Sequence, residues 1–328
     1  MLADHLQPNL LQEEPEMTPS RNGYGEGLKE AGEKNRNVVA LSADLTESTR
    51  THHFAEAFPE RFIQVGIAEQ NMASVASGLA AMGKIPFVAS YAMFSPGRSW
   101  EQVRTTIAYN DSNVKIIGAH AGVSVGPDGA THQALEDIAI MRVIPNMVVI
   151  APCDVHEAKR ATLAAVEYEG PVYIRVGREK TPVVTSVGSP FSIGKAEVFM
   201  RGNEAHEKKV GIIVTGTLAH NALSAARELN EKGIGASVLN MATIKPLDTA
   251  ALENFAAEHD ALVTVEEHQV AGGLGSAVAE HLSEVAPIKI VKVGVHDQFG
   301  QSGNMDELNA HYGMDVPAIL QAAERALS

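Results

Sequence analysis

Glu69 places a carboxylate at the start of an apolar segment, within Val65-Gly-Ile-Ala-Glu-Gln-Asn-Met72. After Asn71 no charged residue occurs until Lys84, and the larger apolar residues recur at helical spacing: Met72, Val75, Leu79 and Met82. This pattern predicts a buried helix with Glu69 at its mouth. The carboxylate is then either solvated in the first turn, where the helix dipole favours it, or buried with a partner that needs it.

The segment from His120 to Gln133 contains a second histidine, His132, together with Asp128, three glycines and a proline. Imidazoles exchange protons near neutral pH, and glycines let a backbone approach a ligand closely. One interpretation is therefore a site of proton transfer. The alternative is a surface turn with two ordinary histidines.

Polar and aromatic side chains also follow other apolar, strand-like runs. Asp44 and Ser48 follow the first of these runs, the segment from His120 to Gln133 follows a later one, and Arg178 follows the last. Because ligands gather beyond the carboxyl ends of parallel strands, these three groups are candidates for one shared cleft. Tyr91 and Phe94 follow another run. The aromatic rings can stack on a planar heterocycle, although core packing is their commoner role. For the arginine, the alternative is a solvated side chain in a weak ion pair.

Length and composition limit the class of protein. A chain of 328 residues, 45% hydrophobic and 20% charged, predicts a soluble globular protein of two domains. The net charge of −14 argues against nucleic acid or an anionic membrane as the main partner. The single cysteine, Cys153, excludes an intrachain disulfide and a cysteine metal cluster. The start of the chain lacks a signal-peptide pattern and no apolar run reaches membrane-spanning length, so we expect a cytoplasmic protein.

Apolar runs alternate with helical patterns, which predicts an open α/β fold with a mostly parallel sheet. We expect strands at 37–44, 85–90, 114–119, 147–151 and 172–176, and in a second domain at 210–215, 236–239, 261–265 and 288–293. The predicted division is a polar, loosely held arm (1–17), a larger α/β domain (18–185), a linker (186–196) and a smaller α/β domain (197–328). The glycine-rich stretch 266–276 is predicted to be a structural strand-to-helix turn.

Several short motifs occur in a characteristic order: Ser42–Leu45 with Ser48, Gly66–Gln70, Tyr91–Phe94, Gly126–Gln133, and Arg142–Met147 followed by Ala151–Asp154. In this order and spacing they resemble the C-terminal half of transketolase. The resemblance covers nearly the whole chain from Met17 onward. It implies a pyrimidine-binding domain followed by the third domain of the same enzymes, and a transferase of carbohydrate metabolism of the pentose phosphate type.

The resemblance also implies thiamine diphosphate as the cofactor, with its aminopyrimidine bound by this chain. Glu69 would hydrogen-bond the pyrimidine ring nitrogen and favour the imino tautomer that removes the thiazolium proton. Tyr91 and Phe94 would stack on the ring or form its wall, and Asp44 is placed with these cofactor-binding residues. The cofactor is the electron sink, and the protein positions it.

A sugar phosphate site follows from the same resemblance. His132, also a catalytic residue, and Asp128 would face the sugar hydroxyls. The phosphate would be held by four further side chains: Arg21, Ser48, His120 and Arg178. Several donors converging on a dianion is reasonable chemistry, and guanidinium groups provide the planar fork that phosphate prefers.

Full-length transketolases also have a diphosphate-binding domain, in which Gly-Asp-Gly and a later Asn hold the divalent cation. The nearest string here, Pro127-Asp-Gly-Ala130, belongs to the histidine-containing segment. We therefore expect a C-terminal subunit of a split transketolase, completed by an N-terminal subunit that binds the diphosphate and a cation such as Mg²⁺. A heterotetramer is expected, with one seam at a small-residue face made of Ala73, Ala76, Ser77 and Ala80.

Other readings remain open. The beta subunit of a 2-oxo acid dehydrogenase would have the same two domains without a sugar phosphate pocket. A split enzyme like deoxyxylulose phosphate synthase, or a transketolase devoted to an unusual sugar phosphate, would share Thr131-His-Gln133. A noncatalytic scaffold subunit would have no need of Glu69, Asp128 and His132 together.

Overall fold

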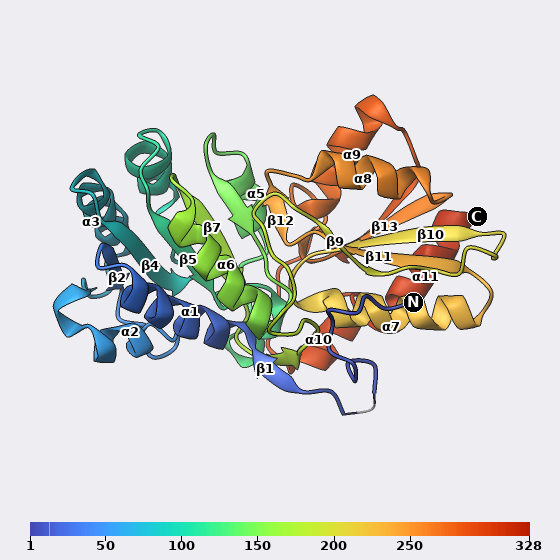
Figure 1. Ribbon diagram of the computed structural model, residues 1–328, viewed down its shortest axis with the longest axis horizontal. Coiled ribbons are helices and arrows are strands. Elements are labelled where there is room, and N and C mark those ends of the chain that lie inside the picture. The colour runs from blue at the N-terminus through green and yellow to red at the C-terminus, as the bar shows by residue number, and fades with distance from the viewer. Residues whose placement is uncertain (13) are drawn as a thin grey trace.

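The computed structural model describes residues 1–12 and 14–328. Figure 1 shows two α/β lobes side by side along the long axis, the first coloured blue to green and the second yellow to red. Each lobe is built around one largely parallel sheet, which confirms the predicted fold class. Among the helices of the described residues, none combines the length and the apolar character that crossing a bilayer requires.

The sheet of the first lobe has seven strands. Six of them come from residues 38–176 and are parallel. Five of these six are buried over most of their length because helices cover both faces, which explains their largely apolar sequences, whereas the edge strand Phe62–Gln64 is partly exposed. The seventh strand comes from the second half of the chain and pairs antiparallel with its neighbour, which the sequence did not indicate. In spatial order the strands are β12 (Thr243–Lys245), β6 (Val148–Ile150), β7 (Val172–Val176), β5 (Lys115–Ala119), β4 (Ile85–Tyr91), β2 (Val38–Ser42) and β3 (Phe62–Gln64).

Helices α1 (Ser20–Lys34) and α6 (Val155–Glu167) lie side by side on one face of this sheet (Figure 1). Their backbones approach so closely that a Cβ on Gly23 would lie 1.9 Å from the carbonyl oxygen of Val155. Glycine is therefore required at that crossing. The remaining helical segments of the lobe are α2 (His52–Ala57), η1 (Pro59–Arg61), α3 (Glu69–Ala81), α4 (Trp100–Gln102), the π-helical η2 (Val103–Ala108), η3 (Val123–Asp128) and α5 (Asp137–Arg142).

Helix α3 differs from the predicted buried helix. Met72 is buried, but Gly78 is exposed and a Cβ there would meet nothing within 4 Å. Ala73 and Ala76, which we expected at a subunit seam, belong instead to the core of the chain itself. The sequence could not separate these possibilities, because small residues suit both a close contact within the chain and one between chains.

The N-terminal arm is held more firmly than its polar sequence indicates. Leu6 and Leu10 are 4% and 1% exposed and join the core of the second lobe. The backbone N–H of Gln7 also donates to the carbonyl oxygen of Val184 at 2.9 Å. Glu13, which belongs to the predicted arm, lies outside the described residues. The arm then leads into β1 (Met17–Pro19), which pairs antiparallel with β8 (Lys180–Pro182).

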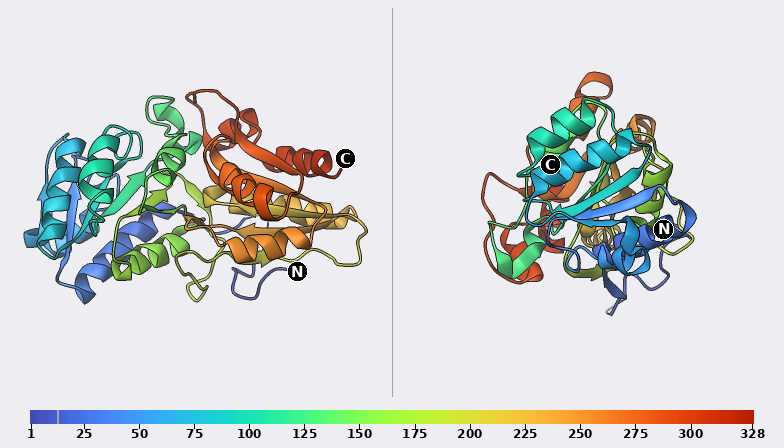
Figure 2. Two further views of the ribbon diagram at one scale, coloured as in Figure 1. Left: turned by 90° about the horizontal axis from the view of Figure 1, so that it is seen from above. Right: turned by 90° about the vertical axis from the view of Figure 1, so that its left-hand side faces the viewer.

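The sheet of the second lobe runs in the order β14 (Ile290–Val295), β13 (Ala261–Gln269), β10 (Lys209–Val214), β11 (Gly235–Asn240) and β9 (Glu197–Met200), with only β9 antiparallel. The two sheets and their helices are seen from two further directions in Figure 2. Strand β12 lies in the second half of the chain but pairs with β6 of the first sheet, so the chain does not divide cleanly into one sheet for each half. The predicted domain boundaries at 185 and 197 stay a prediction. The helical segments are η4 (Gly216–Leu218), α7 (Ala219–Glu231), α8 (Thr249–Ala257), α9 (Leu274–Val285), α10 (Met305–His311) and α11 (Val316–Leu327).

The glycine-rich turn between β13 and α9 is filled by a side chain of the protein. The carboxylate of Glu266 accepts hydrogen bonds from the backbone N–H groups of Leu274 at 2.7 Å and Gly275 at 2.8 Å. A Cβ on Gly273 would lie 1.9 Å from a Glu266 oxygen. The turn therefore caps α9 with an internal carboxylate, in agreement with the structural role predicted for it.

Candidate active site

Four aromatic rings meet where β4 and β5 end. Tyr91 stacks on His120, with ring centroids 3.9 Å apart and planes inclined by 22°. It also stacks on Phe94 at 5.9 Å and 16°. His132 meets Tyr91 and Phe94 edge-on, at 6.1 and 5.4 Å. The structure thus brings two separate parts of the sequence into one aromatic wall, as expected for side chains that follow neighbouring parallel strands.

His120 occupies an unusual position in this wall. Its backbone has φ 55°, in the left-handed region that non-glycine residues seldom adopt, and its side chain is 1% exposed. Nη1 of Arg21 lies 3.0 Å from Nε2 of His120; because a guanidinium only donates, Nε2 accepts and the ring proton is on Nδ1. Burial, followed by the positive charges of Arg21 and Arg178, lowers the pKa of His120 to about 3. His120 is therefore a neutral acceptor at neutral pH.

Arg21 connects this histidine to the loop after β2. Its Nη1 also donates to the backbone oxygen of Ser48 at 2.8 Å. Within the described part of the chain, Nε of Arg21 and Nδ1 of His120 are buried donors without a hydrogen-bond partner. Burial, and then the nearby Arg50 and Arg178, lowers the pKa of Arg21. Unpaired donors among converging cations form a place where an anion would be stabilised.

Glu69, the first residue of α3, is 1% exposed. Its Oε2 accepts from Nη1 of Arg98 at 2.9 Å, and its Oε1 accepts a longer contact of 3.4 Å from the hydroxyl of Ser90. The guanidinium carbon of Arg98 lies 4.9 Å from the centre of the Phe94 ring, which connects the carboxylate to the aromatic wall. Of the two alternatives for Glu69, the structure therefore shows the buried and partnered one.

Arg98 was not predicted as a site residue. It follows Phe94 after a Ser-Pro-Gly segment that has no periodic pattern, so nothing in the sequence separates it from a solvated surface arginine. Its side chain is half exposed. Only the folded chain shows that its charged end reaches a buried carboxylate.

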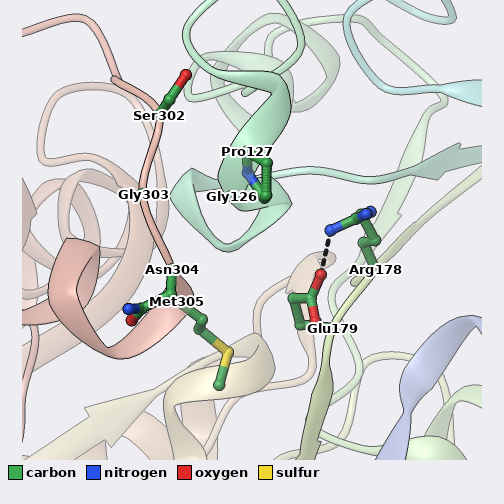
Figure 3. Close-up of a pocket in the computed structure, with 8 residues that line it drawn as sticks. All are labelled: Gly126, Pro127, Arg178, Glu179, Ser302, Gly303, Asn304 and Met305. Carbon is green, nitrogen blue, oxygen red and sulfur yellow. Dashed lines mark hydrogen bonds and ion pairs between the residues drawn. The ribbon is translucent and has the colours of Figure 1, made fainter.

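The remaining candidates lie at the edge of the site. Asp44 and Asp128 are exposed, and within residues 1–12 and 14–328 neither side chain hydrogen-bonds another candidate residue. Arg178 forms an ion pair with Glu179 and donates to the backbone oxygen of Val125 at 3.2 Å. A cavity of about 480 Å³ opens beside this pair, and the segment Ser302–Met305 of the second lobe lines its far side (Figure 3).

These features define a class of site. A stacked aromatic face beside a buried carboxylate suits a planar, nitrogen-containing ring, and the neighbouring unpaired donors suit an anionic ligand. The lobes that carry them are of the doubly wound α/β type, in which ligands bind beyond the strand ends. The chain is thus a two-lobed α/β protein whose first lobe brings an aromatic face, a buried carboxylate and a cluster of cationic side chains together near the strand ends.

Comparison with protein families assigns both lobes. Residues 16–183 match the transketolase pyrimidine-binding domain, and residues 202–319 match the transketolase C-terminal domain. The first match alone covers more than half of the chain. The chain therefore belongs to the transketolase family, which confirms the resemblance inferred from the motifs.

Individual relatives agree with this assignment. A putative transketolase C-terminal section of Methanocaldococcus jannaschii is 47% identical over 302 residues, which are 91% of this chain and 93% of that protein. The 6-deoxy-6-sulfo-D-fructose transketolase subunit SqwH of a Clostridium species is 41% identical over 303 residues, 92% of each chain. A solved structure titled "Split gene transketolase, inactive beta4 tetramer" is 45% identical with a TM-score of 0.85, covering 94% of this chain and 98% of that one.

Proposed function

We propose that this chain is the C-terminal subunit of a split transketolase, which transfers a two-carbon ketol unit from a ketose phosphate to an aldose phosphate. The observation that supports this most directly is the buried Glu69 carboxylate beside the aromatic wall, on a transketolase pyrimidine-binding domain. The proposed cofactor is thiamine diphosphate, which supplies the electron sink for carbon–carbon bond cleavage and formation next to a carbonyl. A role in pentose phosphate metabolism is part of the proposal.

The residues of this chain fit the pyrimidine half of that cofactor. Oε1 of Glu69 has only the long contact to Ser90, so it retains the capacity to share a proton with a pyrimidine ring nitrogen, which has no hydrogen of its own to donate. Tyr91 and Phe94 would wall the ring, and Asp44 would lie at the rim beside it. The burial of Glu69 excludes water from this contact, which strengthens it.

The cationic cluster fits the anionic end of the substrate. Arg21, Arg178 and the neutral His120 would bind the phosphate together with Ser48, and the unpaired donors on Arg21 and His120 would then find an acceptor. His132 and Asp128, further along the same loop, would face the sugar hydroxyls. His132 would move a proton at a hydroxyl of the substrate, since an imidazole can act as acid or base near neutral pH.

A separate N-terminal subunit would hold the diphosphate and a divalent cation such as Mg²⁺, in a heterotetramer. Ile67 and Met82, which flank α3, and Tyr109, which follows η2, are 74%, 80% and 83% exposed, and a partner subunit would cover such side chains. The solved relative is described as an inactive tetramer of one kind of chain, which is consistent with a subunit that associates but needs a partner for activity.

Separate expression tests this proposal. The purified chain, the N-terminal subunit and their mixture would be assayed for ketol transfer with thiamine diphosphate and Mg²⁺. Only the mixture is expected to be active. Substantial transfer by this chain alone would overturn the split-subunit proposal.

The assay should include an unusual acceptor and donor as well as common sugar phosphates, because one relative is named for a sulfonated sugar. Both domain matches are to transketolase, which favours the sugar enzyme over the beta subunit of a 2-oxo acid dehydrogenase. A scaffold without catalysis would assemble with the partner and show no transfer in any mixture.

A further inference from the structure

Residues 120–133, here called the histidine loop, are closed at their base. Ala121 and Ala134 form a β-bridge, and the backbone N–H of Gly122 donates to the oxygen of Ala134 at 2.9 Å. The short helix η3 begins directly after Gly122, which has no side chain to cap it. The loop carries Asp128 and His132, so its conformation sets where both side chains lie.

The missing cap is supplied by the second lobe. Glu267, on β13, accepts the backbone N–H of Ser124 on Oε1 at 2.6 Å and the hydroxyl of Thr217 on Oε2 at 2.8 Å. Glu267 is 3% exposed and Ser124 is 2% exposed. A charged acceptor on a buried N–H makes one of the stronger hydrogen bonds in a protein. The carboxylate thus performs the role of an N-cap across 143 residues of sequence.

The absence of a side chain at Gly122 leaves room for this carboxylate. Its φ is 86°, and a Cβ at this position would lie 2.3 Å from Cδ of Glu267. Any side chain here would force the two lobes apart or displace the carboxylate. Glycine is therefore needed both for the backbone conformation and for the close approach.

Further contacts tie the same parts together. Nη2 of Arg175 donates to the backbone oxygen of Glu267 at 2.8 Å and to that of Ala134, at the base of the loop, at 3.3 Å. Nε2 of Gln133 donates to the oxygen of Val123 within the loop at 2.9 Å and to that of Gln301 in the second lobe at 3.0 Å. Figure 3 shows the neighbouring segment 302–305 facing Gly126 and Pro127.

We propose that the second lobe positions the substrate-facing part of the histidine loop through Glu267, whose carboxylate holds the first turn of η3 in place. Glu267 is a positioning residue, because it acts on the backbone that carries Asp128 and His132 and does not itself reach the aromatic wall. This inference rests on the proposed function in assigning a substrate to the loop. It gives the C-terminal domain a role in the active site of the same chain.

The test compares two adjacent buried carboxylates. Glu267→Ala removes the cap on η3, and Glu266→Ala removes the cap on α9, which lies away from the loop. Glu267→Ala leaves the N–H of Ser124 and the hydroxyl of Thr217 without their acceptor, and Glu266→Ala leaves the N–H groups of Leu274 and Gly275 without theirs, so the losses of stability should be similar. Glu267→Gln is the rescue variant, because its amide oxygen can accept from Ser124 while its amide nitrogen donates to Thr217.

Steady-state kinetics of each variant assembled with the N-terminal subunit give the first readout. Glu267→Ala is expected to reduce kcat/KM for the sugar phosphates about tenfold or more, Glu267→Gln to restore most of it, and Glu266→Ala to stay within about twofold. Equal kinetic losses in the two alanine variants would reduce Glu267 to a purely structural residue and overturn the inference.

Hydrogen exchange of the full chain provides a readout that does not depend on activity. Glu267→Ala should accelerate exchange of the amides at 123–132, whereas Glu266→Ala should accelerate it at the start of α9. Unchanged exchange in the histidine loop would overturn the inference and leave the proposed function intact. Accelerated loop exchange together with an assembled wild-type complex that transfers no ketol unit would instead count against the proposed function.

Discussion

The ion pair between Glu69 and Arg98 leads to a quantitative prediction. The carboxylate is 1% exposed, whereas the arginine side chain is 49% exposed, and Nη1 to Oε2 is 2.9 Å. A fully buried charged hydrogen bond contributes about 1.5–3 kcal/mol, and an exposed ion pair contributes about 0–1 kcal/mol. Since solvent screens one partner only, we expect a coupling free energy of about 1–2 kcal/mol. Arg98→Ala alone should cost more than this coupling, because it leaves a buried carboxylate with only the long contact to Ser90.

The assay is a double-mutant cycle of Arg98→Ala, Glu69→Gln and the double variant, followed by urea unfolding. All four proteins must be compared at one protein concentration, because self-association adds apparent stability. The double variant should be less destabilised than the sum of the single variants by the coupling free energy. Additive effects within about 0.3 kcal/mol would refute the view that Arg98 compensates the buried charge.

Three further predictions concern buried groups. The pKa of His120 is about 3 in the folded chain, below the usual 6.5, so between these two pH values the unfolded chain binds more protons than the folded chain. The free energy of unfolding should therefore rise with pH across this window. His120→Asn should flatten the rise. Burial, followed by the charge of Asp154, raises the pKa of Glu157 from 4.5 to about 7, so between these two pH values the folded chain binds more protons than the unfolded chain. The free energy of unfolding should therefore fall as the pH rises through that range. Glu157→Gln should remove the fall. Both slopes are measured by urea unfolding at several pH values, and parallel profiles of variant and wild type would contradict them. Gly118→Ala would place a Cβ 2.1 Å from the hydroxyl of Tyr173, so thermal unfolding should show a loss of about 1–3 kcal/mol, and an unchanged melting temperature would show that the strand yields instead.

Much of the fold was predictable because periodicity reports burial. Buried parallel strands such as Lys115–Ala119 and Val172–Val176 have largely apolar sequences, with Lys115 and Arg175 the charged exceptions. That lysine is fully buried, and its Nζ donates to the backbone oxygens of Tyr168 and Gly170, both at 2.7 Å. Strand β12 was missed because three residues carry no period, and its neighbours come from distant sequence.

The site was predictable to the extent that its residues follow strands. Four residues that the resemblance assigned to the site, Tyr91, Phe94, His120 and His132, have rings that lie together, and their roles toward cofactor and substrate stay a prediction. Glu267 and Arg98 were not expected, because their importance lies in contacts across 143 and 29 residues of sequence, and neither forms part of a local pattern. Contacts of this kind depend on how the lobes pack, which no local window of sequence reports.

We propose that Glu69 acts on the pyrimidine of thiamine diphosphate. The most direct measurement is ketol transfer by the complex of this chain with its N-terminal subunit, comparing wild type with Glu69→Gln, while assembly is followed by sedimentation. For Glu69→Gln we expect a loss of about a hundredfold or more in kcat with assembly intact. A Glu69→Gln complex that assembles and turns over at the wild-type rate would contradict it.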